Sequence, residues 1–542
     1  MPKIDNDPSL IEYWIMGHKA GALQKTGKIV EAAYLYSLIF ANCPEKRESA
    51  IRSFKINTDE QWGQCLLLCQ NDKERATLYA LRAHKNNSRL IVEMKDIYQL
   101  DPKNAYLESL ALGETKRLEK DLLGYTFNDK KKINKKYFGL PRKNAGENVI
   151  QLLTFVQQIV KEKKTKRQDF WKILEGYLEV LSGDYYYAKE SFAKAGKIVT
   201  NDTLKLQLKV FELALEISSW DKITPKIEDR IVEIKRDKEK YLEKNPDFND
   251  MLRDKMAWLY HNNGDEAKAF LCYNAITDLR PNPVLKIVND LLDITEKKDI
   301  TEIEKLMITK PDGTTIRNDV IDMKANYFLS TFQIEKALEI YKQMPDETYW
   351  DKYGLFNPFA ERINDCVNCP IPDSLTALNK GDLMRLILNK KLESVSEMNK
   401  NKAALLNYQL GLAFYNMTYF SYAWKAMDYY RSDVSIRSAR KYKDAIFPTN
   451  LSPFGNKENF DCREALKYFN KARILTTNPE LGAKAAFMAA KCEQNDYYVN
   501  GAPDQKKPHD NFNILMDQFK DTQFYGKLIN ECRYFNTYVS KF

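Results

Sequence analysis

The sequence predicts an all-α protein, organised as an α-solenoid of helical hairpins that is interrupted by loops. Helix-breaking residues are scarce, since the 542-residue chain contains only 20 Gly and 19 Pro, and the alternation typical of strands is rare. The chain is also longer than a single hydrophobic core usually grows, which favours an extended array. Small and aromatic residues recur at helical spacing in several stretches, a pattern typical of stacked hairpins.

The clearest hairpin lies in residues 170–195. Gly176 would let the first helix approach its neighbour closely, and Gly183 with Asp184 provides the turn. The second helix carries small, aromatic and small residues at i, i+4 and i+7, namely Ala188, Phe192 and Ala195. Two small residues flanking an aromatic ring let neighbouring helices interlock. This stretch therefore predicts two short amphipathic helices folded against each other.

Two more stretches place small, turn and aromatic residues in the same order. In the first stretch, residues 14–44, they are Ala20, Gly27, Ala32, Tyr36 and Pro44. In the second, residues 257–281, they are Ala257, Tyr260, Gly264, Ala269, Tyr273 and Pro281. Each stretch resembles a tetratricopeptide repeat, whose first-helix small residue, turn glycine, second-helix alanine, aromatic residue and terminal proline match these positions. The resemblance implies a right-handed α-solenoid.

Further units follow towards the C-terminus. Ala337 lies 68 residues (337 − 269) after Ala269, which is two periods of 34 residues, and a divergent repeat is expected between them at residues 284–292 and 303–307. The next two units carry Leu410, Gly411, Phe414 and Ala423, then Ala465, Phe469 and Ala472. A helix over 483–492 should pack on the latter, and helices over 512–519 and 524–542 should close the array.

Charged and proline-rich stretches divide the chain. Lysine runs in residues 129–167 predict a solvated linker that contains one helix over 149–160, and we expect a domain boundary here. Prolines interrupt the chain again at residues 347–375 and 431–460. The expected regions are 1–128 (hairpins), 129–168 (basic linker), 169–345 (central array), 346–400 (Pro/Cys loop and helices) and 401–542 (C-terminal array with capping helices).

Several stretches also resemble a family of tetratricopeptide-repeat proteins from Bacteroidota. They are AAYLYSLIFANCPEKRESA, LDPKNAYLESLALGETKRLEKDLLG, YFGLPRKNAG, FWKILEGYLEVLSGD, ERINDCVNC and INECRYFNTYV, and the likeness covers nearly the whole chain. The resemblance implies no activity. Members of this family are longer at the N-terminus and carry an export-type leader.

Composition limits the compartment and the partner. The net charge of +9 is mild for 542 residues, so nucleic acid is an unlikely partner. The first ten residues lack the pattern of a signal peptide, and no apolar run reaches membrane-spanning length. We therefore expect a cytoplasmic protein, and a periplasmic or envelope-associated one if the natural N-terminus is longer.

Cys366 and Cys369 form the one spacing with chemical meaning, because two thiolates three residues apart can share a zinc ion or form a disulfide. A single CxxC is half a site, and the four histidines are scattered in sequence. Related sequences read more like CHDCDH here, which weakens a metal interpretation further. Free or structural thiols, a local disulfide and a metal remain the three alternatives, and we expect no metal or other cofactor to be required.

No catalytic motif occurs: phosphate-binding glycine loops, GxSxG, HExxH and EF-hand patterns are missing. We therefore expect a non-enzymatic scaffold that binds a peptide or protein on the concave face of the solenoid. Counting along the hairpins places five residues on that face, with packing between repeats as the alternative: Tyr177, Trp258, Asn326, Leu412 and Tyr415. The runner-up is a metal- or thiol-dependent site at Cys366 and Cys369, and weak RNA binding by residues 130–167 comes third.

Overall fold

The computed structural model describes residues 10–85, 89–122, 144–237, 246–344, 355–365, 378–431, 454, 457–501 and 506–541. Within this part of the chain there are 25 α-helices, and helices account for 74% of the residues. The only sheet in the same part is a two-residue antiparallel pair, β1 (Leu355–Phe356) with β2 (Leu378–Asn379). The prediction of an all-α protein is confirmed.

The chain forms two compact units. Unit 1 comprises Met1–Ile223 with Ile234–Lys255, and unit 2 comprises Thr224–Glu233 with Met256–Phe542. The expected boundary at residues 129–168 therefore does not coincide with the division between the units. Its described part contains α9 (Ala145–Glu162), which covers the expected helix over 149–160 and buries one apolar face within unit 1.

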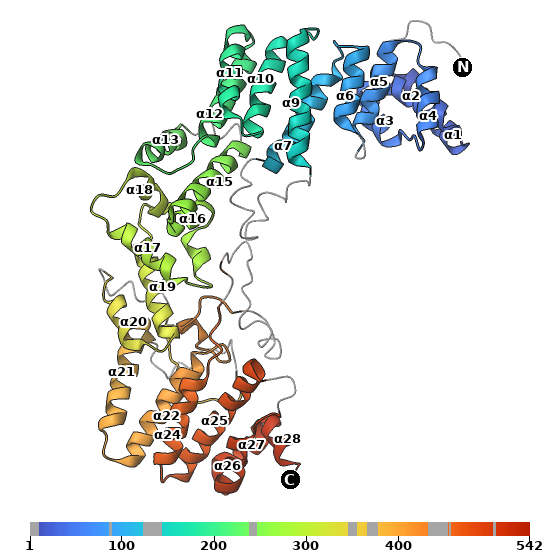
Figure 1. Cartoon of the computed structure of the whole chain (residues 1–542). Helices are drawn as coiled ribbons and strands as arrows, with labels where there is room; N and C mark the ends of the chain where they lie inside the picture. The colour runs from blue at the N-terminus through green and yellow to red at the C-terminus, as the bar shows by residue number, and fades with distance from the viewer. Residues whose placement is uncertain are drawn as a thin grey trace. The chain divides into compact units, whose positions relative to one another are not determined.

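Unit 1 is a series of antiparallel helices (Figure 1). Besides α9 they are α1 (Ile11–Lys25), α2 (Ile29–Asn42), α3 (Arg47–Ser53), α4 (Asp59–Leu68), α5 (Asp72–Ala83), α6 (Leu90–Leu100), α7 (Tyr106–Leu122), α10 (Gln168–Leu181), α11 (Tyr185–Ile198) and α12 (Asp202–Ser218). Helices α13 (Pro225–Arg236) and α15 (Pro246–Asn263) contribute residues to both units.

The hairpin of α10 and α11 forms as predicted. Gly183 turns the chain with φ of +83°, a conformation that glycine adopts without strain. A Cβ atom added at Gly176 would lie 2.6 Å from the ring of Phe192, so only glycine lets this ring sit against the helix. Ala188 and Ala195 are fully buried on either side of the ring. A glycine beneath a phenylalanine ring thus holds the two helices together.

Unit 2 continues with further hairpins. Its helices include α16 (Glu266–Tyr273), α17 (Leu285–Glu296), α18 (Glu302–Ile308), α19 (Arg317–Ser330), α20 (Ile334–Tyr341), α21 (Lys380–Ser396), α22 (Lys400–Asn416), α24 (Arg463–Leu475), α25 (Pro479–Asn500), α26 (Asp510–Phe519), α27 (Gln523–Glu531) and α28 (Arg533–Val539). Helices α17 and α18 occupy the positions expected for the divergent repeat, but they pack on α16 and α19 rather than on each other. The expected single helix over 524–542 is instead two helices, because Cys532 between them has extended backbone angles.

The prediction that Ala423 lies on the second helix of the Gly411 hairpin is wrong. Residues 417–431 form turns and one 3₁₀ helix (Trp424–Ala426), since the hydroxyl of Thr418 donates to the carbonyl of Tyr415 and ends α22. The true second helix is α24: a Cβ atom at Gly411 would lie 2.6 Å from the ring of Phe469. The hairpin is therefore the same as that of α10 and α11, with a long insertion between its helices.

The same contact occurs a third time. A Cβ atom added at Gly482 of α25 would lie 2.6 Å from the ring of Phe519 in α26. Helices α21, α22, α24, α25 and α26 consequently lie side by side in this order at the C-terminal end of unit 2 (Figure 1). Their side chains form one hydrophobic core that extends back to α16.

Candidate functional site

A non-helical segment of the chain, residues 355–365, lies on the C-terminal helices of unit 2, with a turn at 358–359 and a bend at 363–364. It begins at β1 and then runs beside α22, whose Asn416 side-chain amide donates to the carbonyls of Pro358 (2.6 Å) and Ala360 (3.0 Å). The hydroxyl of Tyr422 donates to the carbonyl of Asn357 (2.6 Å) and accepts the N–H of Ala360 (3.2 Å). Side chains of the array thus bind the main chain of the segment, as they would bind an extended peptide.

The first carboxylate of this segment, on Glu361, is held from two helices. The hydroxyl of Tyr408 in α22 donates to it at 3.0 Å, and the ammonium group of Lys484 in α25 lies 3.0 Å from it. The side chains of Glu361 and Lys484 are 39% and 33% exposed to solvent. Solvent therefore reaches this ion pair, which limits its strength.

The second carboxylate, on Asp365, is held in the same way. The hydroxyl of Tyr415 in α22 donates to it at 2.9 Å, and the ammonium group of Lys491 in α25 lies 2.5 Å from it. Lys491 also donates to the carbonyl of Ile363 (3.3 Å) and lies 4.9 Å from the ring centroid of Tyr415. This lysine keeps only 12% of its surface exposed, so the second pair is the better shielded of the two.

The Tyr–Lys pair occurs twice because each of the two helices carries its residue type twice at the same spacing. Tyr408 and Tyr415 are seven residues apart on α22, and Lys484 and Lys491 are seven residues apart on α25. Seven residues are close to two helical turns, so each couple lies on one face, about 10 Å apart along its helix. We call these four residues the two-carboxylate clamp. Residues 363–364 bend between Glu361 and Asp365, so this segment is shorter than the about 13 Å that four residues span in an extended chain.

The electrostatics keep both tyrosines protonated. Burial, followed by the neighbouring carboxylate, raises the pKa of Tyr408 well above its ordinary value. Burial and the carboxylate of Asp365 do the same to the pKa of Tyr415. Both hydroxyls therefore remain hydrogen-bond donors at neutral pH, which is the state that a carboxylate ligand requires.

Of the five predicted partner-facing residues, only Tyr415 belongs to this clamp. Leu412 lies on the same helix but is buried in the core. Asn326 is buried and donates to the carbonyl of Met427 (2.5 Å). Trp258 is half-buried on α15, and Tyr177 belongs to unit 1. Leu412, Asn326 and Tyr415 are all buried, as packing between helices, the alternative interpretation, requires.

Tyr177 is also a packing residue. Its ring stacks on Phe211 with 3.8 Å between the centroids, and its hydroxyl donates to the carboxylate of Glu119. Cys366 and Cys369, the candidate metal-binding or thiol pair, lie outside the described residues, as do 123–143 of the basic run. Sequence reasoning missed Tyr408, Lys484 and Lys491. Their signal was the repetition of one residue type at a spacing of seven on two helices.

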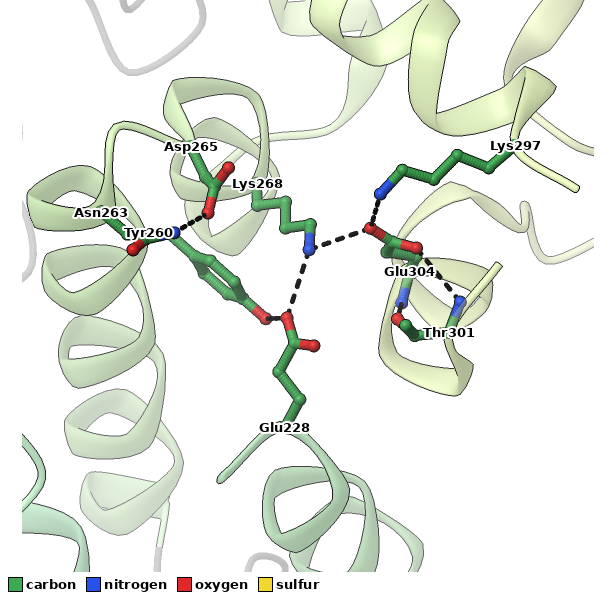
Figure 2. A network of polar contacts seen from close by, with 8 residues as sticks. All are labelled: Glu228, Tyr260, Asn263, Asp265, Lys268, Lys297, Thr301 and Glu304. Carbon is green, nitrogen blue, oxygen red and sulfur yellow. Dashed lines mark hydrogen bonds and ion pairs between the residues drawn. The ribbon is translucent and has the colours of Figure 1, made fainter. Parts of the chain in front are cut away.

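A second polar cluster lies around Lys268 of α16 (Figure 2). Its ammonium group is 3.2 Å from Glu228 of α13 and 2.9 Å from Glu304 of α18. The hydroxyl of Tyr260 donates to Glu228 (2.9 Å), and Lys297 lies 2.6 Å from Glu304. Two lysines thus balance two glutamates, which indicates a structural role: the cluster fastens four helices to one another.

A third polar cluster borders a cavity of about 470 Å³ beside α19. The carboxylate of Asp322 is fully buried, forms an ion pair with buried Lys380 (3.3 Å), and accepts the hydroxyls of Tyr341 and Tyr429. Tyr429 belongs to the insertion after α22, so this cluster fixes the insertion onto α19.

Asp428, next to Tyr429, lines the same cavity. Burial, supported by the charge of Glu458, raises the pKa of Asp428 to about 8, although the backbone N–H of Asn459 and the charges of Lys380 and Lys457 act in the opposite direction. At neutral pH this shift favours the protonated carboxyl group over the carboxylate in the wall of the cavity.

Comparison with known proteins gives no family for the chain: no family model, no curated protein and no solved structure matches it. In the described residues, no helix is long and apolar enough to cross a membrane. The same residues contain no group of three or more His, Cys, Asp or Glu side chains placed to hold a metal ion. The geometry of the two-carboxylate clamp is therefore the strongest guide to function.

Proposed function

We propose that this chain is a non-enzymatic scaffold that binds a non-helical acidic segment of a partner protein on the two-carboxylate clamp. The observation that carries the proposal is the segment 355–365, which occupies the clamp with both its main chain and its carboxylates. Asn416 and Tyr422 bind main-chain groups that every peptide has, and these contacts provide affinity. The clamp itself provides selectivity for acidic side chains.

The clamp selects a spacing as well as a charge. Its two Tyr–Lys pairs are about two helical turns apart, and they match carboxylates four residues apart in a non-helical segment that bends between them, as residues 361–365 do. A partner segment should therefore carry acidic residues at i and i+4, as the chain itself does with Glu361 and Asp365. A helical segment would bring the same two carboxylates to about 6 Å of each other and would not span both pairs.

The chain's own segment competes with any such partner. Because it is covalently attached, its effective concentration near the clamp is of order mM for a flexible connection. A partner must displace it or bind when it is released. Competition of this kind makes the scaffold selective, since only a segment with better contacts than residues 357–365 remains bound.

The architecture supports the proposal at a coarser level. We propose that each unit is a stretch of right-handed α-solenoid of the tetratricopeptide type. The recurring glycine–phenylalanine contacts of Gly176, Gly411 and Gly482 support it. Arrays of this kind bind partners through side chains that successive helices present to one surface, which is how α22 and α25 present the clamp.

The proposal is tested with a fluorescein-labelled peptide, NPFAERIND, which reproduces residues 357–365. Glu361→Gln with Asp365→Asn in the full chain should weaken the internal segment, so this variant should bind the peptide more tightly than the unaltered chain does. Each lost ion pair is worth up to about 1 kcal/mol, or roughly a fivefold change in Kd. Fluorescence anisotropy measures the effect.

Two controls separate recognition from general charge attraction. Lys484→Met and Lys491→Met in the Glu361→Gln, Asp365→Asn background should each weaken peptide binding. Lys527→Met on α27 should not, although it removes the same charge from the same unit. A peptide with Gln and Asn in place of its Glu and Asp should bind weakly. Equal binding of the acidic and the amide peptide would contradict the proposal.

A further inference from the structure

The cavity of about 470 Å³ beside α19 lies between three parts of unit 2 that hold one another in place. They are residues 280–283, the α19–α20 hairpin and the insertion after α22. The N–H of Lys457 in the insertion donates to the carbonyl of Pro281 (2.9 Å), and the side-chain amide of Asn282 donates to the carbonyl of Phe454 (2.8 Å). The walls are therefore fixed by the protein's own contacts, and the volume is in the range of small-molecule sites.

One wall of this cavity contains a phenylalanine in a backbone conformation that favours glycine. Phe332, in the turn between α19 and α20, has φ of +60°. The next residue, Gln333, donates its N–H to the carbonyl of Phe328, five residues earlier (2.9 Å). Three other hairpins have the same hydrogen bond in their turn and a glycine at the position of Phe332, namely Gly27, Gly183 and Gly264. A residue with a Cβ atom adopts this conformation only against a steric penalty.

The penalty at Phe332 places an aromatic ring at the cavity. This ring packs edge-to-face on Phe414 with 5.5 Å between the centroids, and it lines the cavity together with Tyr327 and Phe460. A glycine would form the same turn but would leave this wall without its ring. Strained residues are found at binding sites, where the position of the side chain outweighs the cost of the backbone. The three rings give the cavity an apolar surface that suits a flat molecule.

Two cations share one carboxylate at Arg280, a residue of the cavity wall. Arg280 and Lys310 lie 2.9 and 3.1 Å from the carboxylate of Asp319. The guanidinium group of Arg280 uses Nη2 for this ion pair, and its Nε is buried without a hydrogen-bond partner within the described residues. A buried donor is costly unless an acceptor reaches it. A carboxylate in the cavity would supply the acceptor and balance the second cation.

The other charges of the cavity lining nearly cancel. Arg463 and Asp461 form an ion pair with 2.6 Å between their nearest atoms, and the charge of Lys457 opposes that of Glu458. Burial raises the pKa of Asp428 to about 8, so the form of this acid that is favoured at neutral pH adds no negative charge. The lining therefore has about one positive charge in excess, which is complementary to a ligand with one negative charge.

We propose that this cavity binds a small aromatic monocarboxylate, with the ligand's carboxylate on the Nε of Arg280 and its ring against Phe332. Lys457 adds attraction for the negative charge from the insertion. The inference is independent of the two-carboxylate clamp, which recognises side chains of a protein segment. The cavity thus gives the scaffold a second partner, a small molecule, at a different place in unit 2.

The probes for this site are cinnamate and phenylacetate, each of which combines one ring with one carboxylate. They are titrated into the full-length chain at neutral pH, and isothermal titration calorimetry measures the Kd. We expect saturable binding of at least one probe, and about tenfold weaker binding of the matching amide, cinnamamide or phenylacetamide, which lacks the charge. No binding of either acid would overturn the proposal, and so would equal binding of acid and amide.

Three substitutions in the full-length chain locate the bound probe. Arg280→Lys keeps a charge beside Asp319 but removes the Nε donor, so it should raise the Kd about tenfold. Phe332→Gly introduces the residue that the other turns have, so the helices should remain while the ring and the binding are lost. Lys457→Met should raise the Kd about threefold. Circular dichroism checks the helices of each variant, and an unchanged Kd in folded Arg280→Lys would overturn the proposal.

Lys336 provides a matched control for Lys457. Their ammonium groups each lie 5.6 Å from the centroid of an aromatic ring, that of Phe328 for Lys336 and that of Tyr327 for Lys457. Among the described residues that line the cavity, Lys457 is present and Lys336 is not. Lys336→Met should therefore leave the Kd of the probe unchanged. An equal loss of affinity in Lys336→Met and Lys457→Met would mean that general charge attraction holds the probe, and it would overturn the proposal.

Discussion

The α10–α11 hairpin of unit 1 and the α22–α24 hairpin of unit 2 use the same contact but differ in their connection. In both, a helix glycine lies beneath a phenylalanine ring, Gly176 with Phe192 and Gly411 with Phe469. A tight turn at Gly183 joins the first pair, whereas residues 417–462 separate the helices of the second. The comparison teaches that the packing of two helices can be kept while the connection between them grows from a tight turn into a long insertion.

The added residues of the second hairpin have two roles in the structure. Tyr429 hydrogen-bonds to Asp322 of α19, and the stretch around Asp428 and Asn459 lines the cavity there. Tyr422 contacts the segment 355–365. The insertion thus contributes polar contacts that join it to α19 and to segment 355–365.

The largest expected effect tests whether the two contacts are equivalent. Phe192→Ala and Phe469→Ala should each destabilise their own unit by about 3–5 kcal/mol, because both rings are buried and leave a cavity. Urea unfolding followed by circular dichroism measures the loss. If Phe469→Ala costs much less than Phe192→Ala, the insertion has weakened the second hairpin and the comparison fails.

The next largest effect is a pH-dependent change in stability, which we expect for the interrupted hairpin alone. Since the pKa of Asp428 is about 8 in the fold and near 3.8 in the unfolded chain, only the folded state holds the proton between these values. The stability of unit 2 should therefore fall as pH rises from about 4 to about 8. Asp428→Asn removes this pH-dependent contribution. As pH rises from about 4 to about 8, the free energy of unfolding of the variant should therefore increase, relative to that of the unaltered chain, by on the order of a few kcal/mol.

Urea titrations at pH 5 and pH 8.5 compare the two proteins. The groups that act on Asp428 are Glu458, Lys380 and Lys457, and all three remain in the variant. If the difference in stability between Asp428→Asn and the unaltered chain is the same at both pH values, Asp428 is ionised in the fold. The insertion would then present a charge to the cavity.

A smaller effect sharpens the comparison at its glycines. Gly176→Ala and Gly411→Ala should each cost about 1–3 kcal/mol from overpacking, reduced by up to about 1 kcal/mol of gained helix propensity. Gly113 of α7 and Gly526 of α27 are matched controls, since an added Cβ meets nothing within 4 Å at either position. Alanine there should stabilise the protein slightly. If thermal unfolding shows that Gly411→Ala is tolerated as well as Gly526→Ala, the close approach of Phe469 to Gly411 is contradicted.

The smallest effect concerns the clamp. Tyr408→Phe removes one hydrogen bond to the half-exposed Glu361, so it should cost about 1 kcal/mol or less in stability. In contrast, it should weaken binding of the labelled peptide, because the peptide's glutamate loses the same donor. A Tyr408→Phe chain with unchanged peptide affinity would indicate that Lys484 alone holds this carboxylate.

The helices and the first hairpins were predictable because their information is local. Gly176, Gly183 and Phe192 lie within one short stretch, and the role of each can be predicted from its residue type and its spacing from the others. The Gly411 hairpin was not predictable in the same way. Ala423 lies at the sequence distance from Gly411 that a second helix would have. No residue near Gly411 in sequence indicates that the ring packed on this glycine belongs to Phe469.

The sequence by itself determined that the chain is helical, where most helices lie, and that small residues face aromatic ones, because each of these depends on neighbours along the chain. The tertiary structure alone decided which segments meet. Glu361 and Asp365 reach Tyr408, Tyr415, Lys484 and Lys491 from distant positions in the sequence. Contacts between distant residues depend on the packing of whole helices, and no local pattern of residues encodes them.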